Sequence, residues 1–85
     1  MADNQAFTDA QARVKTLSTL PSTGDLLELY ALFKQATAGD ATGARPGMFD
    51  MKGRAKFDAW SGKKGISKDA AENQYVAIVD RLAKA

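Results

Sequence analysis

The chain has 85 residues, a net charge of +2, and neither cysteine nor histidine. A chain of this length is expected to form one domain over residues 1–85, in which about 60% of the surface of the unfolded chain is buried. Without cysteine and histidine, the sequence excludes a disulfide scaffold, cysteine chemistry and the usual metal sites, and it lacks the commonest general base. No apolar run approaches the length of a membrane span, and the first residues are too polar to begin a signal peptide. We therefore expect a cytoplasmic protein with no stable membrane insertion.

The positive charge is concentrated in one segment. Residues 52–68 contain six basic residues and a single acidic one, Asp58, so the rest of the chain is net negative. Such asymmetry is typical of a protein with an anionic partner, whether a nucleotide, a nucleic acid or a membrane. A solvated lysine-rich helix has the same composition, and composition alone slightly favours that second interpretation.

The first predicted helix spans residues 3–17. Its apolar residues Phe7, Ala10, Val14 and Leu17 are spaced by three, four and three, which is typical of an amphipathic helix. The acidic residue 3 near its start and Lys15 near its end suit the helix dipole. A contact of Lys15 with a ligand is an equally open interpretation. A short break follows, and Pro21 or Ser22 marks the start of the next helix, which should be an antiparallel neighbour of the first.

The second predicted helix, from residue 26 to Gly39, is apolar around more of its circumference than a surface helix needs. Only Glu28 and Gln35 mark a clearly polar edge. Tyr30 and Lys34 are one turn apart on the surplus apolar face. Two interpretations remain open. In one, part of this face contacts a ligand; in the other, the helix simply lies at the centre of a bundle.

A loop of about a dozen residues, rich in glycine and proline, extends to Asp50. It is long enough to run back along the bundle, so that the third helix can lie parallel to the second. Met48 and Phe49 are predicted to pin this loop to the core.

The third predicted helix runs from Met51 to about Gly62 and is capped by Asp50. Lys52 and Lys56 are one turn apart and project together. For Trp60, a place in the core is the favoured interpretation, and a platform for a ligand is the less favoured one. The fourth helix begins after Ser67 and carries an apolar face; Tyr75, Ile78, Val79 and Leu82 form it. These four elements predict an all-α bundle with one overhand connection.

Catalytic constellations are nearly absent, so we expect no enzyme. The carboxylates are scattered, and no serine has a histidine to activate it. The Gly39–Gly43 segment lacks the lysine and hydroxyl residue of a phosphate loop, and no strand precedes it. A covalent acyl carrier is excluded because no serine follows an aspartate and the predicted working face is basic. A small basic helical module that binds another anionic partner, such as nucleic acid, remains the alternative, although the sequence has no nucleic-acid recognition motif.

Two long motifs resemble the acyl-coenzyme A-binding proteins. Residues Leu29–Asp40 (LYALFKQATAGD) are similar to one signature of that family, and residues Arg45–Trp60 (RPGMFDMKGRAKFDAW) to a second. Residues 65–70 (GISKDA) and Tyr75 continue the resemblance, which covers essentially the whole chain. It implies a four-helix bundle with up-down-down-up order and a long overhand loop between helices two and three. It also implies non-catalytic binding, buffering and intracellular delivery of long-chain fatty acyl-CoA. We further expect a monomer that uses no cofactor and binds no nucleic acid.

The resemblance also implies which residues bind the ligand. Tyr30 and Lys34 match residues that meet the nucleotide and its ribose phosphate, Lys56 matches another phosphate ligand, and Lys52 matches a nearby basic contact. Lysine supplies a point charge for a phosphate, and a tyrosine ring can stack on adenine.

Further contacts are implied by the first, second and fourth helices. Lys15 matches a contact from the first helix, Tyr75 matches an aromatic contact from the last, and Leu27 with its neighbours offers an apolar surface for the acyl chain. The family uses the segment between Tyr30 and Lys34 as a contact strip, and here that strip consists of Ala31, Leu32 and Phe33. Phe33 replaces the tyrosine common in the family, which removes a hydroxyl group and leaves a ring that can stack.

Overall fold

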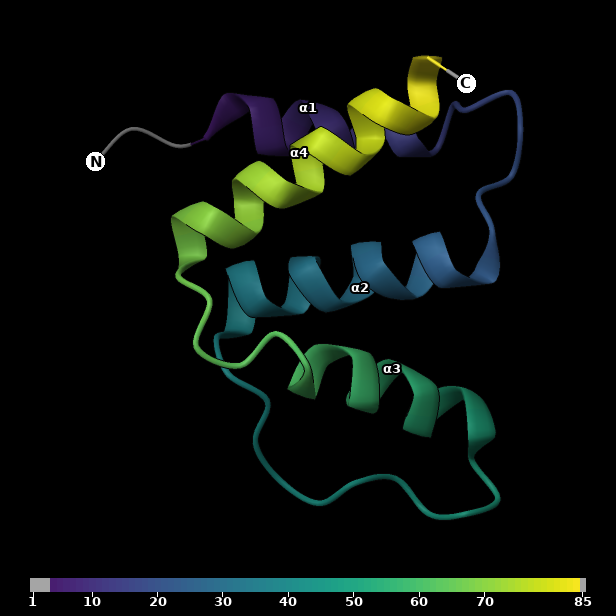
Figure 1. Cartoon of the computed structure of the whole chain (residues 1–85), viewed down its shortest axis with the longest axis vertical. Helices are drawn as coiled ribbons and strands as arrows, with labels where there is room; N and C mark the ends of the chain where they lie inside the picture. The colour runs from purple at the N-terminus through teal and green to yellow at the C-terminus, as the bar shows by residue number, and fades with distance from the viewer. Residues whose placement is uncertain (1–3, 85) are drawn as a thin grey trace.

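The computed structural model describes residues 4–84, and the segments within this range form helices and loops without a strand. The helices are α1 (Gln5–Val14), α2 (Thr23–Ala38), α3 (Met51–Ser61) and α4 (Lys68–Lys84). α1 and α4 run in one direction and α2 and α3 in the other, as Figure 1 shows. The predicted all-α, up-down-down-up bundle is therefore confirmed. The first helix is shorter at both ends than predicted, and residue 3, which was expected at its start, lies outside the described residues.

Short polar side chains set the starts of the helices. The Ser22 hydroxyl accepts a hydrogen bond from the Asp25 N–H (3.1 Å), and the Asp50 carboxylate accepts one from the Gly53 N–H (2.9 Å). The Ser67 hydroxyl accepts one from the Ala70 N–H (3.1 Å). Each bond satisfies a backbone donor that has no partner within its helix. All three predicted starts are confirmed.

α2 is the centre of the bundle because it packs against both α3 and α4, whereas α1 packs against α4. α1 is antiparallel to α2, as predicted, but the two are not direct neighbours. They meet only through long side chains, with the ring centroids of Phe7 and Phe33 6.3 Å apart. The connection at residues 15–22 is long enough to set α1 over α4, where Phe7 and Ala10 join the core residues of that helix.

The core lies between α2, α4 and α1, and among the described residues two polar side chains, Gln35 and Glu72, are buried with it. Gln35, predicted on a wet edge, is only 3% exposed. Its amide donates hydrogen bonds to Asp40 (2.7 Å) and to the Ile66 carbonyl (2.9 Å). Glu28, the other predicted edge residue, is half-buried and pairs with Lys63. The prediction was wrong for Gln35, because α2 is covered from two sides and a polar residue there needs hydrogen bonds. The Glu28 side chain is still 39% exposed.

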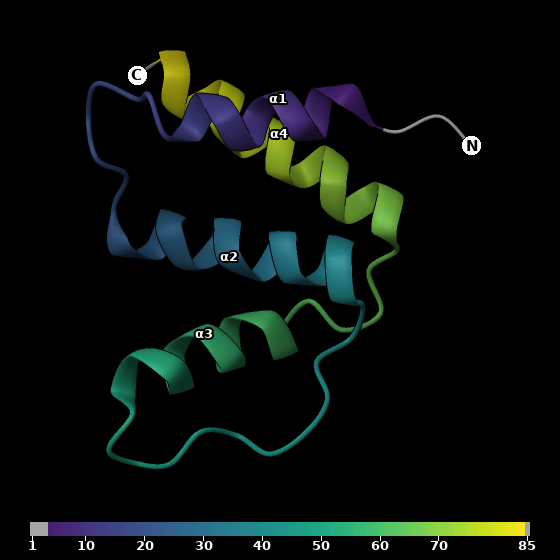
Figure 2. The same cartoon turned by 180° about the vertical axis from the view of Figure 1, so that it is seen from behind.

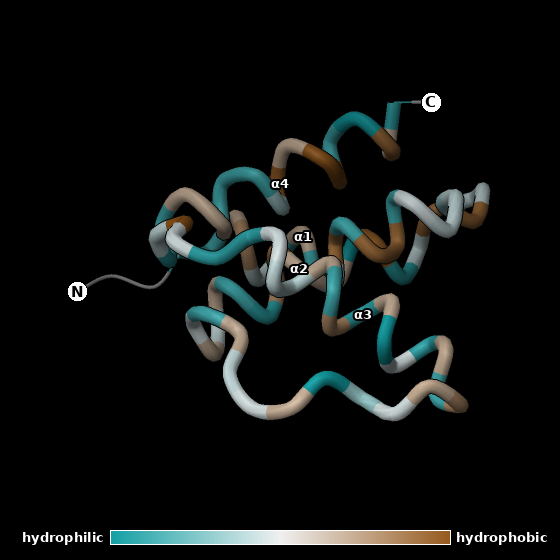
Figure 3. The backbone as a smooth tube through the Cα atoms, turned by 60° about the horizontal axis from the view of Figure 1, so that its bottom comes forward, coloured by the Kyte–Doolittle hydropathy of each residue, from teal (hydrophilic) through white to brown (hydrophobic). Residues whose placement is uncertain are grey.

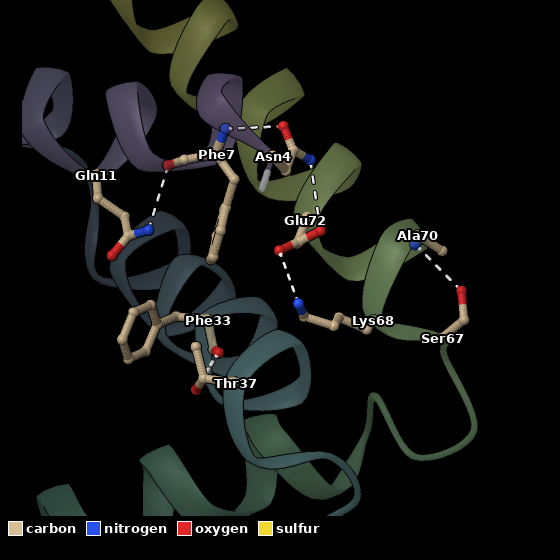
Figure 4. A network of polar contacts seen from close by, with 9 residues as sticks. All are labelled: Asn4, Phe7, Gln11, Phe33, Thr37, Ser67, Lys68, Ala70 and Glu72. Carbon is tan, nitrogen blue, oxygen red and sulfur yellow. Dashed lines mark hydrogen bonds and ion pairs between the residues drawn. The ribbon is translucent and has the colours of Figure 1, made fainter. Parts of the chain in front are cut away.

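A buried carboxylate lies in α4. Glu72 is shielded from solvent and receives the amide of Asn4 at 3.5 Å and the ammonium of Lys68 at 3.7 Å, as Figure 4 shows. Asn4 also caps α1 by accepting the Phe7 N–H (3.2 Å). This residue therefore links the start of α1 to α4.

The overhand loop, residues 39–50, runs back beside α3, which Figure 2 shows from behind. Polar contacts hold it: the Arg45 guanidinium forms two bonds to the Asp58 carboxylate (2.7 and 2.9 Å), and Trp60 Nε1 donates to the Gly39 carbonyl (2.7 Å). Met48 and Phe49 are 68% and 96% exposed, so the prediction that they pin the loop to the core is wrong.

Each helix carries both hydrophobic and hydrophilic residues, as the mixed colouring of Figure 3 shows. The described residues accordingly include no helix that is both long and apolar enough to cross a bilayer. The bundle is flat, with extents of 36 × 34 × 15 Å, so much of each helix faces solvent.

Candidate functional site

Two lysines of neighbouring helices lie over aromatic rings of the opposite helix. Lys34 Nζ of α2 is 4.8 Å from the ring centroid of Trp60 in α3, and Lys56 Nζ of α3 is 5.4 Å from that of Tyr30 in α2. Each helix therefore supplies one lysine and one aromatic residue, one turn apart. We call Tyr30, Lys34, Lys56 and Trp60 the lysine–aromatic cluster. Three of its members are predicted site residues, and helical spacing alone placed Tyr30 beside Lys34.

Trp60 was predicted as a core residue, and its place in this cluster was missed. It is half-buried, its Nε1 is bonded to the Gly39 carbonyl, and its ring meets Phe57 edge-on at 6.3 Å. One face of the ring carries the Lys34 ammonium. The signal in the sequence was the spacing of four between Lys56 and Trp60, which puts both on the same side of α3.

The site has positive charge without counter-charges. Within residues 4–84, five basic residues form ion pairs; these are Arg13, Arg45, Lys63, Lys68 and Arg81. None of the ion pairs in that range involves a lysine of the predicted site, which are Lys15, Lys34, Lys52 and Lys56. The basic residues of the described chain thus include some that form ion pairs within the bundle and site lysines whose ammonium groups remain available to an anion.

A chain of aromatic rings links α4, α1 and α2. The Tyr75 ring meets Phe7 edge-on, with centroids 5.2 Å apart and planes at 86°, and Phe7 is 6.3 Å from Phe33. Figure 4 shows Phe7 directed from α1 towards α2. Tyr75 is 5% exposed, and burial raises the pKa of its hydroxyl, which keeps that group protonated and able to donate a hydrogen bond.

The residues of the predicted contact strip on α2 face three different directions. Phe33 is half-buried beside the Tyr30 side of the helix. Ala31 is fully buried and, with Leu27, lines a cavity of about 240 Å³ against α3. Leu32 is 1% exposed and belongs to the core with α4. Successive helical residues are about 100° apart, so contiguous residues cannot share one face.

Lys15 and Lys52 are the two predicted site lysines outside the lysine–aromatic cluster. Lys15 is exposed at the C-cap of α1, and Lys52 is exposed in the first turn of α3, one turn before Lys56. Within residues 4–84 neither forms a hydrogen bond or ion pair with a cluster residue. The structure therefore brings together Tyr30, Lys34 and Lys56. Lys52 lies one helical turn before Lys56, and Lys15 comes from the end of α1.

The arrangement suits a ligand with phosphate groups and a flat ring. Unpaired ammonium groups from two helices can hold a phosphate through charge-assisted hydrogen bonds. Half-buried aromatic rings beside them can stack on a base.

Comparison with known proteins gives consistent results. The family model described as acyl CoA binding protein matches residues 4–79. Acyl-CoA-binding protein homolog 1 of Caenorhabditis elegans is 60% identical over 77 residues, covering 91% of this chain and 90% of the relative. The acyl-CoA-binding protein homolog of Manduca sexta is 55% identical over 83 residues, covering 96% and 92%.

Solved structures are similar over the same length. The crystal structure of Oryza sativa acyl-CoA-binding protein 2 has a TM-score of 0.89 and 41% identity, covering 94% of this chain and 89% of that one. The solution structure of the yeast acyl coenzyme A binding protein has a TM-score of 0.74 and 49% identity, covering 96% and 95%.

Proposed function

Because the chain belongs to the acyl-CoA-binding protein family, we propose that it binds long-chain fatty acyl-CoA and releases it unchanged. The observation that carries this proposal is the lysine–aromatic cluster, whose two ammonium groups have aromatic rings and no carboxylate as partners among the described residues. In this role the protein buffers and delivers acyl-CoA within the cytoplasm as a monomer, with no catalytic step.

The cluster is the proposed binding site for the nucleotide. Lys34 and Lys56 come from different helices, and a phosphate between them would replace weak cation–π contacts by charge-assisted hydrogen bonds. The ring of Tyr30 offers a stacking surface for adenine. Lys15 and Lys52 add positive charge around the site, and Tyr75 adds an aromatic contact.

The proposed acyl surface lies on α2. Leu27 is half-buried and partly open to a ligand, and Phe33 continues the apolar side beyond Tyr30. Ala31 and Leu32 are covered by α3 and α4, so we assign them the role of holding α2 in place beneath the ligand. A fatty acid alone would find no lysine placed specifically for its carboxylate.

The alternative function, binding of nucleic acid, gains no support from the comparisons. The two signatures, the family match and the cluster all favour a nucleotide ester over a polymeric phosphate backbone. Strong binding of nucleic acid at physiological salt would reverse this choice.

Titration calorimetry with hexadecanoyl-CoA tests the proposal. We expect saturable binding with one site per chain, and chromatography of the mixture should recover the intact thioester. Absence of binding, or release of free fatty acid, would contradict it.

A further inference from the structure

Arg54 of α3 differs from the other arginines of the chain. The chain has four arginines, and three of them pair with an aspartate: Arg13 with Asp80, Arg45 with Asp58, and Arg81 with Asp25. Among residues 4–84 the guanidinium of Arg54 has no such partner. Its Nε is buried and donates to no acceptor in that range, although the residue as a whole is half-buried. A buried N–H of a charged group is costly without an acceptor, so this atom points to a missing partner.

Arg54 lies on the side of α3 that faces away from the lysine–aromatic cluster. Lys56 of α3 rests over the ring of Tyr30 in α2. Two residues along a helix correspond to a rotation of about 200°, so Arg54 projects from the side opposite Lys56. The overhand loop runs along the side of α3 that is away from α2, as Figure 1 and Figure 2 show. The body of the helix therefore separates Arg54 from the cluster.

The overhand loop supplies a second guanidinium beside Arg54. Arg45 of the loop donates to both carboxylate oxygens of Asp58, which lies one turn after Arg54 on α3. These hydrogen bonds hold the pKa of Asp58 below its usual 3.8, and the nearby charge of Arg54 acts in the same direction. Asp58 is therefore ionised at neutral pH and neutralises Arg45. The three side chains together keep one net positive charge.

We propose that Arg54, with Arg45 beside it, forms a binding site for an oxyanion, a phosphate or a carboxylate, between α3 and the overhand loop. The forked donors of a guanidinium match the paired oxygens of these groups. The ion pair with Asp58 uses Nε and Nη2 of Arg45 and leaves its Nη1 free for the anion within the described residues. The bound anion supplies the acceptor that Nε of Arg54 lacks. This site is distinct from the proposed nucleotide site and does not depend on acyl-CoA binding.

NMR of the arginine Nε–H groups tests the site directly, because each of the four arginines contributes one signal. Protein labelled with ¹⁵N, without acyl-CoA, is titrated with sodium phosphate, sodium acetate or sodium chloride at matched ionic strength. The signal of Arg54 is identified by its loss in Arg54→Lys. We expect this signal to move saturably with phosphate, less with acetate and not with chloride. The signals of Arg13 and Arg81 should stay in place, because aspartates already occupy these side chains.

A double variant, Lys34→Ala and Lys56→Ala, separates this site from the proposed nucleotide site. Its Arg54 signal should respond to phosphate as in the parent. Phosphate should also raise its melting temperature, followed by circular dichroism, because an anion that binds only the folded chain stabilises it. Adding Arg54→Gln should make this rise smaller than adding Lys64→Gln does, which removes an equal charge from the exposed turn after α3. General exclusion of phosphate from the protein surface acts on both variants alike.

Four results would overturn the proposal. The first is an Arg54 signal that moves no more with phosphate or acetate than with chloride, and the second is equal movement of all four arginine signals. The third is loss of the Arg54 response in the double variant, which would assign the effect to phosphate bound at the lysine–aromatic cluster. The fourth is an equal phosphate-dependent rise in the melting temperature with Arg54→Gln and with Lys64→Gln.

Discussion

Lys34 Nζ lies 4.8 Å from the centroid of the Trp60 ring, so a cation of α2 rests on an aromatic face of α3. The ring itself is held by the bond from its Nε1 to the Gly39 carbonyl (2.7 Å). The cation is the mobile partner of this pair, because the lysine side chain is long and the ring is anchored. A phosphate that binds Lys34 would therefore draw the ammonium away from the ring.

This relationship makes Trp60 a reporter of binding, since it is the only tryptophan of the chain. We expect its fluorescence to change when acyl-CoA is added, because the charge above the indole moves. Lys34→Met keeps most of the aliphatic side chain and removes the charge, so its emission without ligand should resemble that of the liganded parent. Emission that is the same in the parent, the variant and the complex would contradict the proposed movement.

Each of the two lysines of the cluster should strengthen acyl-CoA binding through a specific contact with a phosphate. Lys34→Ala and Lys56→Ala should each weaken hexadecanoyl-CoA binding by about ten-fold or more, since a charge-assisted contact is worth about 1.5–3 kcal/mol. Titration calorimetry measures the loss, and Lys64→Ala is the control because it removes an equal charge from the turn after α3. Small, equal losses in all three variants would indicate a diffuse electrostatic surface without a phosphate pocket.

Head and tail of the ligand should contribute separately. Each methylene buried adds up to about 0.8 kcal/mol, reduced by the cost of ordering the chain. We expect long-chain acyl-CoA to bind most tightly, short-chain esters and coenzyme A clearly less, and free fatty acid least. Competition binding with these four ligands gives the order. A fatty acid that competes as well as its coenzyme A ester would rule out the proposed nucleotide site.

Leu32 should matter for stability more than for contact with a ligand. Its side chain is in the core against α4, so Leu32→Ala should lower the free energy of unfolding by about 2–5 kcal/mol, measured by urea denaturation. Leu20→Ala removes the same atoms from an exposed position and should have little effect. If the folded Leu32→Ala protein loses acyl-CoA affinity while its stability is unchanged, Leu32 is a direct ligand contact.

Asp40 should make the fold sensitive to acid. Hydrogen bonds from the Gly65 N–H and from the Gln35 amide hold the pKa of Asp40 below its usual 3.8. The unfolded chain then binds the proton more readily, so the stabilisation is complete above that usual pKa and is lost as the pH falls through the folded-state pKa. Asp40→Asn should reduce this acid-dependent loss in denaturation curves recorded below pH ~4. An identical pH dependence in parent and variant would show that other carboxylates account for it.

Local features of the chain were predictable from the sequence because they depend on neighbours within one or two turns. Ser22, Asp50 and Ser67 cap helices through backbone groups three residues away, and this relation holds in any fold. Tyr30 and Lys34 share a face for the same reason, since the helical repeat alone sets their positions. The length of the overhand loop likewise permitted parallel α2 and α3 before any packing was known.

The tertiary structure decided which side of each helix is covered, and by what. Gln35 is polar but buried, and Phe49 is apolar but exposed, because α4 and the loop after α3 close over Gln35 while the turn at Asp50 directs Phe49 outward. The placement of Trp60 beneath Lys34 depends in the same way on how α3 lies against α2. These contacts join residues distant in the chain, and their free energy depends on the packing of whole helices, which no periodicity within a single helix can specify.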